Sequence, residues 1–165
     1  MIISIRVDER LIHGQVALVW TKEFSTTHVV VANDAAASNK VQQMTLQMAT
    51  PTGIKVLIKS IDDSIKVFNN PRAKDTRLFV LTANIADALK IVQNCKVGSV
   101  DVANVGRITN PKPGENRIRL NPHLFVDEPE MDALKKLVDS GIEAYNQVLP
   151  SDHKTMISTL IKDVE

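Results

Sequence analysis

The residue types best suited to chemistry gather in one segment near the start of the chain, which reads RVDERLIHGQ over positions 6–15. Its histidine, His13, follows Arg10 by three residues and directly precedes Gly14. An unperturbed imidazole titrates near pH ~6.5, so at neutral pH one ring nitrogen carries a lone pair and can act as a nucleophile. The guanidinium of Arg10 offers paired donors that match phosphate oxygens. These residues favour a site at which His13 accepts a phosphoryl group.

The same side chains also have structural interpretations, which their spacing leaves open. A histidine at a strand-to-helix turn commonly caps the helix or lies at the surface, and Asp8 and Glu9 commonly pair with Arg6 and Arg10. If His13 accepts phosphate, Asp8 orients Arg6 or Arg10 instead of removing a proton, because a neutral imidazole needs no base. Glu9 and His13 supply only two metal ligands, so we expect no metal ion.

The other histidines and the cysteine show no comparable pattern. His28, His123 and His153 are expected to be structural or exposed, and Cys95 has neither a base nearby in the sequence nor a partner for an internal disulfide. The chain also lacks GxGxxG, GxxxxGK before Ser or Thr, HExxH and GxSxG. These absences argue against dinucleotide binding, a P-loop, a zinc protease and an α/β-hydrolase nucleophile. We therefore expect no cofactor.

Hydrophobic periodicity places His13 between a strand and a helix. The alternation of apolar residues predicts a first strand with one buried face at Ile3, Ile5 and Val7. The pattern then becomes helical over 14–24, with one apolar side formed by Val16, Val19 and Trp20. Further strands are expected at 29–32, 54–58, 78–81, 100–103, 117–120 as an edge strand, and 142–149. Further helices are expected from the stripe Val41, Met44 and Met48, from caps at Ser60 and Asp127, over 85–92, and from Pro150 through Ile161.

This alternation of strands and helices predicts an α/β fold in one domain, residues 1–165: a mainly parallel, open, twisted sheet of about seven strands with helices on both faces. The ligand site of such a sheet lies beyond the carboxyl ends of its strands. At that edge the first helix begins, and its backbone at Ile12, Gly14 and Gln15 is expected to bind phosphate. The expected rim of the site consists of Arg6, Asn33, Asp34, Ser60, Asn104 and Arg107.

Composition excludes several classes of partner. The 20 basic and 19 acidic residues give a formal charge of 20 − 19 = +1, and aromatic residues make up 4% of the chain, so we expect no nucleic-acid partner. No stretch approaches the ~18 apolar residues of a membrane span, and no signal peptide is evident. With one cysteine, these features predict a cytoplasmic protein that reaches a membrane only through a partner.

The segment 6–15 resembles the phosphorylation-site signature of the IIB components of the mannose/fructose/sorbose family of the phosphoenolpyruvate-dependent sugar phosphotransferase system. The similarity continues at residues 32–34, 48–51, 104–106 and 150–152, and thus spans nearly the whole chain. Two positions depart from the family pattern. Glu9 stands where the family commonly has Asp, and Arg107-Ile108 follows Gly106 where another loop sequence is usual.

The resemblance implies a subunit with protein-Nπ-phosphohistidine–sugar phosphotransferase activity. A phosphohistidine of a IIA partner would donate its phosphoryl group to His13, with Arg10 stabilising the phosphate. His13 would pass it to a sugar held by the membrane subunits IIC and IID, which leaves the sugar unspecified by this chain. Two alternatives remain open: a soluble α/β phosphohydrolase or mutase that uses His13, and a regulatory phosphoprotein module.

Overall fold

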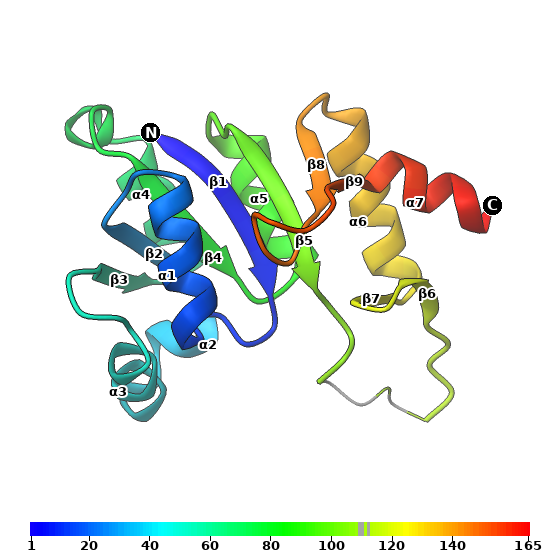
Figure 1. Ribbon diagram of the computed structural model, residues 1–165, viewed down its shortest axis with the longest axis horizontal. Helices are drawn as coiled ribbons and strands as arrows, with labels where there is room; N and C mark the ends of the chain where they lie inside the picture. The colour runs from blue at the N-terminus through cyan, green and yellow to red at the C-terminus, as the bar shows by residue number, and fades with distance from the viewer. Residues whose placement is uncertain (109–110, 112) are drawn as a thin grey trace.

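A seven-stranded sheet forms the centre of the protein (Figure 1). The structure is a computed structural model that describes residues 1–108, 111 and 113–165. The strands lie in the order β3-β2-β4-β1-β5-β8-β9, and every neighbouring pair is parallel except β8 and β9. Their bounds are β1 Ile2–Asp8, β2 His28–Ala32, β3 Lys55–Lys59, β4 Leu78–Thr82, β5 Ser99–Asn104, β8 Glu143–Asn146 and β9 Thr155–Met156. The expected fold class is therefore confirmed.

Helices cover both faces of the sheet. On one face lie α1 (Gly14–Glu23), α2 (Asp34–Ala37) and α3 (Lys40–Met48), around a core that includes Trp20, Phe79 and Leu81. On the other face lie α4 (Ile61–Phe68), α5 (Ile85–Asn94), α6 (Glu128–Asp139) and α7 (Ile157–Val164). Figure 1 shows α1 in front of the sheet, with α4 and α5 behind it. A short 3-10 helix, Pro71–Ala73, precedes β4. No helix within the described ranges has the length and apolar character needed to cross a bilayer.

Because β1 lies at the centre of the sheet, both of its faces are buried, whereas the sequence pattern predicted only one buried face. Ile5 and Val7 are fully buried in one core, as expected. Ile3 is only half-buried, because a register irregularity between Ile2 and Ser4 turns Ile2 inward in its place. On the opposite face, Arg6 and the strand's last residue are buried as well.

Local capping signals were predicted correctly. The Oγ atom of Ser60 accepts the N–H of Asp63 at 3.1 Å at the start of α4. The Oδ1 atom of Asp127 accepts the N–H of Glu130 at 2.8 Å at the start of α6. Both contacts span three residues, so they depend on short-range sequence alone.

Elements that depend on distant partners were predicted less well. The expected edge strand at 117–120 is β6 (Ile118–Asn121), which pairs with β7 (Leu124–Val126) in a separate two-stranded sheet. The last strand ends at Asn146, short of 149. The terminal helix begins at Ile157 instead of near Pro150, because residues 155–156 add to the sheet as β9.

Of two predicted apolar stripes, the one in α3 was wrong and the one in α1 was wrong in part. In α3, Leu46 is the buried residue, whereas Val41, Met44 and Met48 are 73%, 64% and 84% exposed. In α1, Val19 is exposed and Trp20 is buried. Helical spacing shows that residues share a face, but the packing of the helix decides whether that face turns inward.

Candidate functional site

The loop between β1 and α1 is held by hydrogen bonds to Asp8, the last residue of β1, and by the packing of its own apolar side chains. The N–H of Arg10 donates to Oδ1 of Asp8 at 3.0 Å, and the N–H of Leu11 donates to the Asp8 carbonyl oxygen at 2.9 Å. This Asx-type turn places Leu11 in the left-handed region, at φ +57°. Leu11 and Ile12 are each 5% exposed and pack into the core with Trp20. The hydrophobic core thus anchors the loop.

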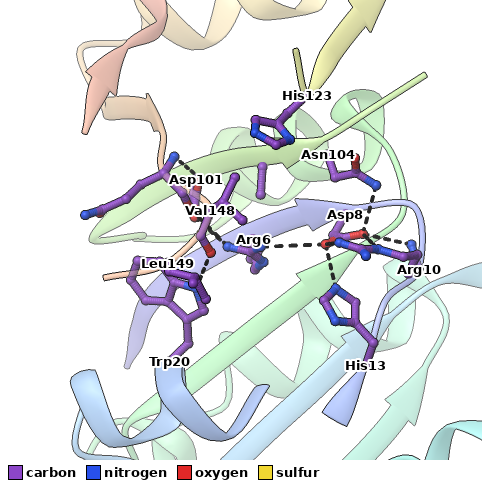
Figure 2. A network of polar contacts seen from close by, with 12 residues as sticks. Arg6, Asp8, Arg10, His13, Trp20, Asp101, Asn104, His123, Val148 and Leu149 are labelled. Carbon is purple, nitrogen blue, oxygen red and sulfur yellow. Dashed lines mark hydrogen bonds and ion pairs between the residues drawn. The ribbon is translucent and has the colours of Figure 1, made fainter. Parts of the chain in front are cut away.

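The carboxylate of Asp8 is the centre of the site and is fully buried (Figure 2). Its Oδ1 accepts Nε of Arg10 at 3.2 Å, and its Oδ2 accepts Nη2 of the same guanidinium at 3.2 Å. Oδ2 also lies 3.1 Å from Nε2 of His13, and Nδ2 of Asn104 lies 3.4 Å from Oδ1. Burial acts to raise the pKa of Asp8, but hydrogen bonds from His13 and Arg10 and the charge of Arg6 outweigh it and hold the pKa well below its usual range. Asp8 is therefore ionised at neutral pH.

The contact with Asp8 determines the tautomer of His13. An ionised carboxylate only accepts hydrogen bonds, so Nε2 of His13 carries the proton and donates it. In the neutral ring the lone pair then resides on Nδ1. The His13 side chain is 26% exposed, so a partner can reach the ring from solvent.

His13 also occupies the N-cap position of α1, with extended backbone angles and no side-chain cap hydrogen bond. The first-turn N–H groups that follow, including those of Gly14 and Gln15, have no partner within an α-helix. Both residues are exposed. Ile12 precedes the cap, so its N–H is not part of this turn. The helix start thus presents positive dipole character beside the imidazole.

Arg10 lies at the surface side of the same carboxylate. Its side chain is 44% exposed, and the Nε–Nη2 edge of the guanidinium is occupied by Asp8. The opposite edge carries the remaining donors, so these are the ones available to an incoming anion.

Several residues expected at the rim are buried, which corrects that prediction. Arg6 is 2% exposed and pairs with Asp101, and its guanidinium carbon lies 5.7 Å from the Trp20 ring centre. Asn104 is 5% exposed. Asn33 is 9% exposed because its side chain caps α2 by accepting the N–H of Ala36 at 2.8 Å. Polar groups at a sheet edge are covered where neighbouring loops need their hydrogen bonds.

The other three rim residues remain accessible but have structural partners. Asp34 accepts the N–H of Ile61 at 2.9 Å, which joins the loops after β2 and β3, and Ser60 caps α4. Arg107 is exposed and its Nη1 lies 3.3 Å from Nδ1 of His123.

Glu9 has a role that sequence reasoning missed. Its Oε1 accepts the N–H of Gly106 at 2.9 Å, and its Oε2 accepts the N–H of Ile108 at 3.1 Å. Gly106 has φ +78°, and a Cβ there would collide with the Phe125 carbonyl oxygen. Glu9 therefore fixes the loop after β5, while His13 faces Asp8, so these two side chains do not point at a shared metal position. Within the described ranges, no three His, Cys, Asp or Glu side chains could hold a metal ion.

His123 and Asp101 also lie near the site, and sequence reasoning assigned neither of them a role there. Burial lowers the pKa of His123, and the positive charges of Arg107, Arg10 and Arg6 lower it further. The negative charge of Asp152 acts in the opposite direction but does not outweigh these effects. His123 follows β6, more than a hundred residues beyond His13, so no spacing pattern links them.

The larger of two hollows in the described part of the chain lies away from His13. A cavity of about 10 Å³ lies beside His13 and Arg6, near the lower limit for one water molecule. A shallow hollow of about 690 Å³ lies at the amino ends of the strands and includes Thr26, His28 and Arg77 in its lining. Of these two hollows, only the water-sized one borders His13.

Known proteins of one family are similar to this chain over nearly its whole length. Residues 2–165 match the family described as "PTS system sorbose subfamily IIB component". A probable phosphotransferase enzyme IIB component of Streptococcus pyogenes serotype M6 is 48% identical over 98% of this chain and 99% of that protein. The mannose-specific EIIAB component of Escherichia coli K12 is 31% identical over 97% of this chain, which spans about half (48%) of that protein. The crystal structure of the IIBSor domain of the sorbose permease from Klebsiella pneumoniae matches with a TM-score of 0.90 and 27% identity, over 100% of this chain and 98% of that one.

Proposed function

Since the chain belongs to the sorbose subfamily of IIB components of the sugar phosphotransferase system, we propose that His13 accepts a phosphoryl group from a IIA phosphohistidine and transfers it to a sugar. The sugar is held by the membrane subunits IIC and IID. The chain works in the cytoplasm, at the membrane surface, through these subunits.

The observation that carries this proposal is the 3.1 Å contact between Nε2 of His13 and Oδ2 of Asp8. It directs the lone pair of the neutral ring to Nδ1, the nitrogen that then attacks phosphorus. The bond between Nδ1 and phosphorus forms as the bond to the donor imidazole breaks. The ring gains positive character in this step, and the buried Asp8 carboxylate stabilises it. A sugar hydroxyl then attacks phosphorus and releases its proton to water, while the bond between phosphorus and Nδ1 breaks and its electron pair returns to the His13 ring.

Arg10 and the start of α1 supply the positive charge that the phosphoryl group needs. Asp8 holds two nitrogens of Arg10, which fixes the guanidinium with its remaining donors toward solvent. The N–H groups of Gly14 and Gln15 add dipolar stabilisation at the other side of the cap. Phosphoryl transfer depends chiefly on such positioning and charge stabilisation, so no cofactor is required.

The partial exposure of His13 supports a reaction with two macromolecular partners. A donor protein and a membrane subunit must each reach the ring, and a 26% exposed side chain at a sheet edge allows this. The Escherichia coli relative is named as a combined EIIAB component, which supports a IIA donor for this chain as well.

The proposal is tested by incubating the full chain with phosphoenolpyruvate, the general phosphotransferase proteins and a IIA protein of the family, and then mapping the modified residue. We expect one acid-labile, alkali-stable phosphate on His13, which is lost in His13→Ala and kept in His153→Ala, a change at an exposed histidine. Labelling of a folded His13→Ala variant would contradict the proposal.

A second step separates the proposal from its alternatives. Phosphorylated chain is added to membranes that contain IIC and IID, and sugar phosphate is measured. Transfer to sugar supports the proposal. Hydrolysis of a soluble phosphoester by the chain alone would indicate a phosphohydrolase or mutase, and a phosphoprotein that never yields sugar phosphate would indicate a regulatory module.

A further inference from the structure

A buried ion pair, Arg6 with Asp101, lies behind the groups that contact His13. Both residues are 2% exposed. Nη1 of Arg6 donates to Oδ2 of Asp101 at 2.9 Å and to the carbonyl oxygen of Gln147 at 3.2 Å. Oδ1 of Asp101 accepts the N–H of Gln147 at 3.0 Å. Asp101 thus uses both oxygens to tie Arg6 to the segment that follows β8.

The other terminal nitrogen of Arg6 lies toward the site (Figure 2). Nη2 has no hydrogen-bond partner among the described residues, and its distance of 3.7 Å from Oδ2 of Asp8 is too long for a hydrogen bond. The same Oδ2 already accepts His13 and Arg10, at 3.1 and 3.2 Å. A buried donor without a partner is strongly drawn to a nearby carboxylate. A restraint on Arg6 is therefore needed if Oδ2 is to serve His13.

We propose that Asp101 is a positioning residue for the reaction at His13: it restrains Arg6, so that Oδ2 of Asp8 stays available to Nε2 of His13. The inference rests on the proposed function, since its consequence is the nucleophilicity of Nδ1. Trp20 supports the same arrangement from α1. Its ring flanks the guanidinium, and its Nε1 donates to the Val148 carbonyl oxygen at 3.0 Å.

An asparagine at position 101 breaks the restraint with little change in volume. The two donors contact different oxygens of Asp101, and the amide replaces one of these oxygens by an NH₂ group, so either Arg6 or the N–H of Gln147 then faces a donor. Arg6 then moves the short distance toward Asp8 and competes with His13 for Oδ2. The imidazole loses its preference for the tautomer with the proton on Nε2, and transfer slows.

The test measures the His13 tautomer in the full, ¹⁵N-labelled chain by long-range ¹H–¹⁵N NMR, with single-turnover transfer from phosphorylated IIA alongside. Spectra are recorded at pH 8, because burial, opposed by Arg6, raises the pKa of Asp101 to about 7. In Asp101→Asn we expect a lower fraction of the Nε2–H tautomer and transfer about 10-fold slower, as for the loss of one charge-assisted hydrogen bond. Ser99→Ala is the matched control, because Ser99 is buried on the same strand and bonds Ser4 instead of Arg6. We expect it to leave both readouts unchanged.

A double variant distinguishes positioning from a merely structural role. Arg6→Gln combined with Asp101→Asn removes both buried charges and leaves no guanidinium to compete for Oδ2. We expect it to recover the parent tautomer. A folded Asp101→Asn variant with parent tautomer and parent rate overturns the inference, and so does a double variant that fails to recover the tautomer.

If Asp101→Asn does not fold, Asp101→Glu replaces it, because the longer side chain displaces both oxygens, and the same results support or overturn the inference. The tautomer measurement needs no phosphoryl donor. A parent chain that is never labelled on His13 therefore refutes the proposed function, whereas an unchanged tautomer in the variant refutes only the role of Asp101.

Discussion

Oδ2 of Asp8 receives both Nε2 of His13, at 3.1 Å, and Nη2 of Arg10, at 3.2 Å. One buried carboxylate therefore orients the proposed phosphoacceptor and fixes the guanidinium proposed to stabilise its phosphate. Because Asp8 ends the central strand and His13 caps the next helix, the geometry depends on a loop of only four residues.

The first prediction concerns which ring nitrogen of His13 carries the phosphate. Asp8 accepts the proton-bearing Nε2, so phosphate is expected on Nδ1 of His13. Coupling between ³¹P and ¹⁵N in the labelled, phosphorylated chain identifies the nitrogen directly. His153→Ala serves as a control that leaves the signal in place, and phosphate on Nε2 would show that Asp8 does not set the reactive tautomer.

Arg10→Lys is expected to slow transfer without unfolding the chain. Lysine has a single nitrogen, so it cannot hold Asp8 with two contacts and also face the phosphate. The loss of a charge-assisted hydrogen bond, about 1.5–3 kcal/mol, corresponds to a rate roughly 10- to 150-fold lower. Single-turnover transfer from phosphorylated IIA measures the effect. Arg119→Lys, at an exposed arginine of β6, is the control, and equal rates for both variants would remove Arg10 from the mechanism.

Glu9→Ala is expected to loosen the loop after β5. The change removes the acceptor of two backbone N–H groups, those of Gly106 and Ile108, and costs about 1–2 kcal/mol of local stability. Amide hydrogen exchange at these two residues should accelerate about 10-fold or more. Glu23→Ala, at an exposed position in α1, should leave their exchange unchanged. Unaltered protection in Glu9→Ala would mean that other contacts hold the loop.

Glu130→Gln is expected to gain stability relative to the parent chain as pH rises. Burial, together with the neighbouring charge of Asp127, raises the pKa of Glu130 to about 7. In the unfolded chain Glu130 ionises near the usual glutamate value of ~4.3. The parent therefore loses folding stability between that pH and about 7, and the glutamine variant does not. For a half-buried group this difference amounts to about 1 kcal/mol after solvent screening.

Urea denaturation at pH 5 and pH 8 measures that difference. Glu128→Gln is the matched control, because Glu128 is exposed on the same first turn of α6. We expect its effect to be similar at both pH values. A Glu130→Gln effect that does not change with pH would contradict the raised pKa.

Features that depend on neighbouring residues could be predicted from the sequence. The order of strands and helices, the caps at Ser60 and Asp127, and the placement of His13 between a strand and a helix all follow from spacings of a few residues. The resemblance to the IIB family, carried by residues 6–15, was confirmed by the match over residues 2–165. Such local patterns can be recognised in the sequence because capping and periodicity act within one or two helical turns.

The burial of the site's supporting residues was decided by the tertiary structure. Arg6 was expected at the rim, but it lies between Asp8 and Asp101, which is 95 residues away in the sequence, and it also bonds Gln147, which is 141 residues away. The sequence by itself determined which segment presents the histidine and which helix follows it. The pairing of β1 with β5, and the packing of α1 and residues 147–148 over that pair, decided which charges face each other away from water. Burial removes the water that would screen these long-range ion pairs, at a cost in desolvation, and no short-range pattern in the sequence records which partners will be buried together.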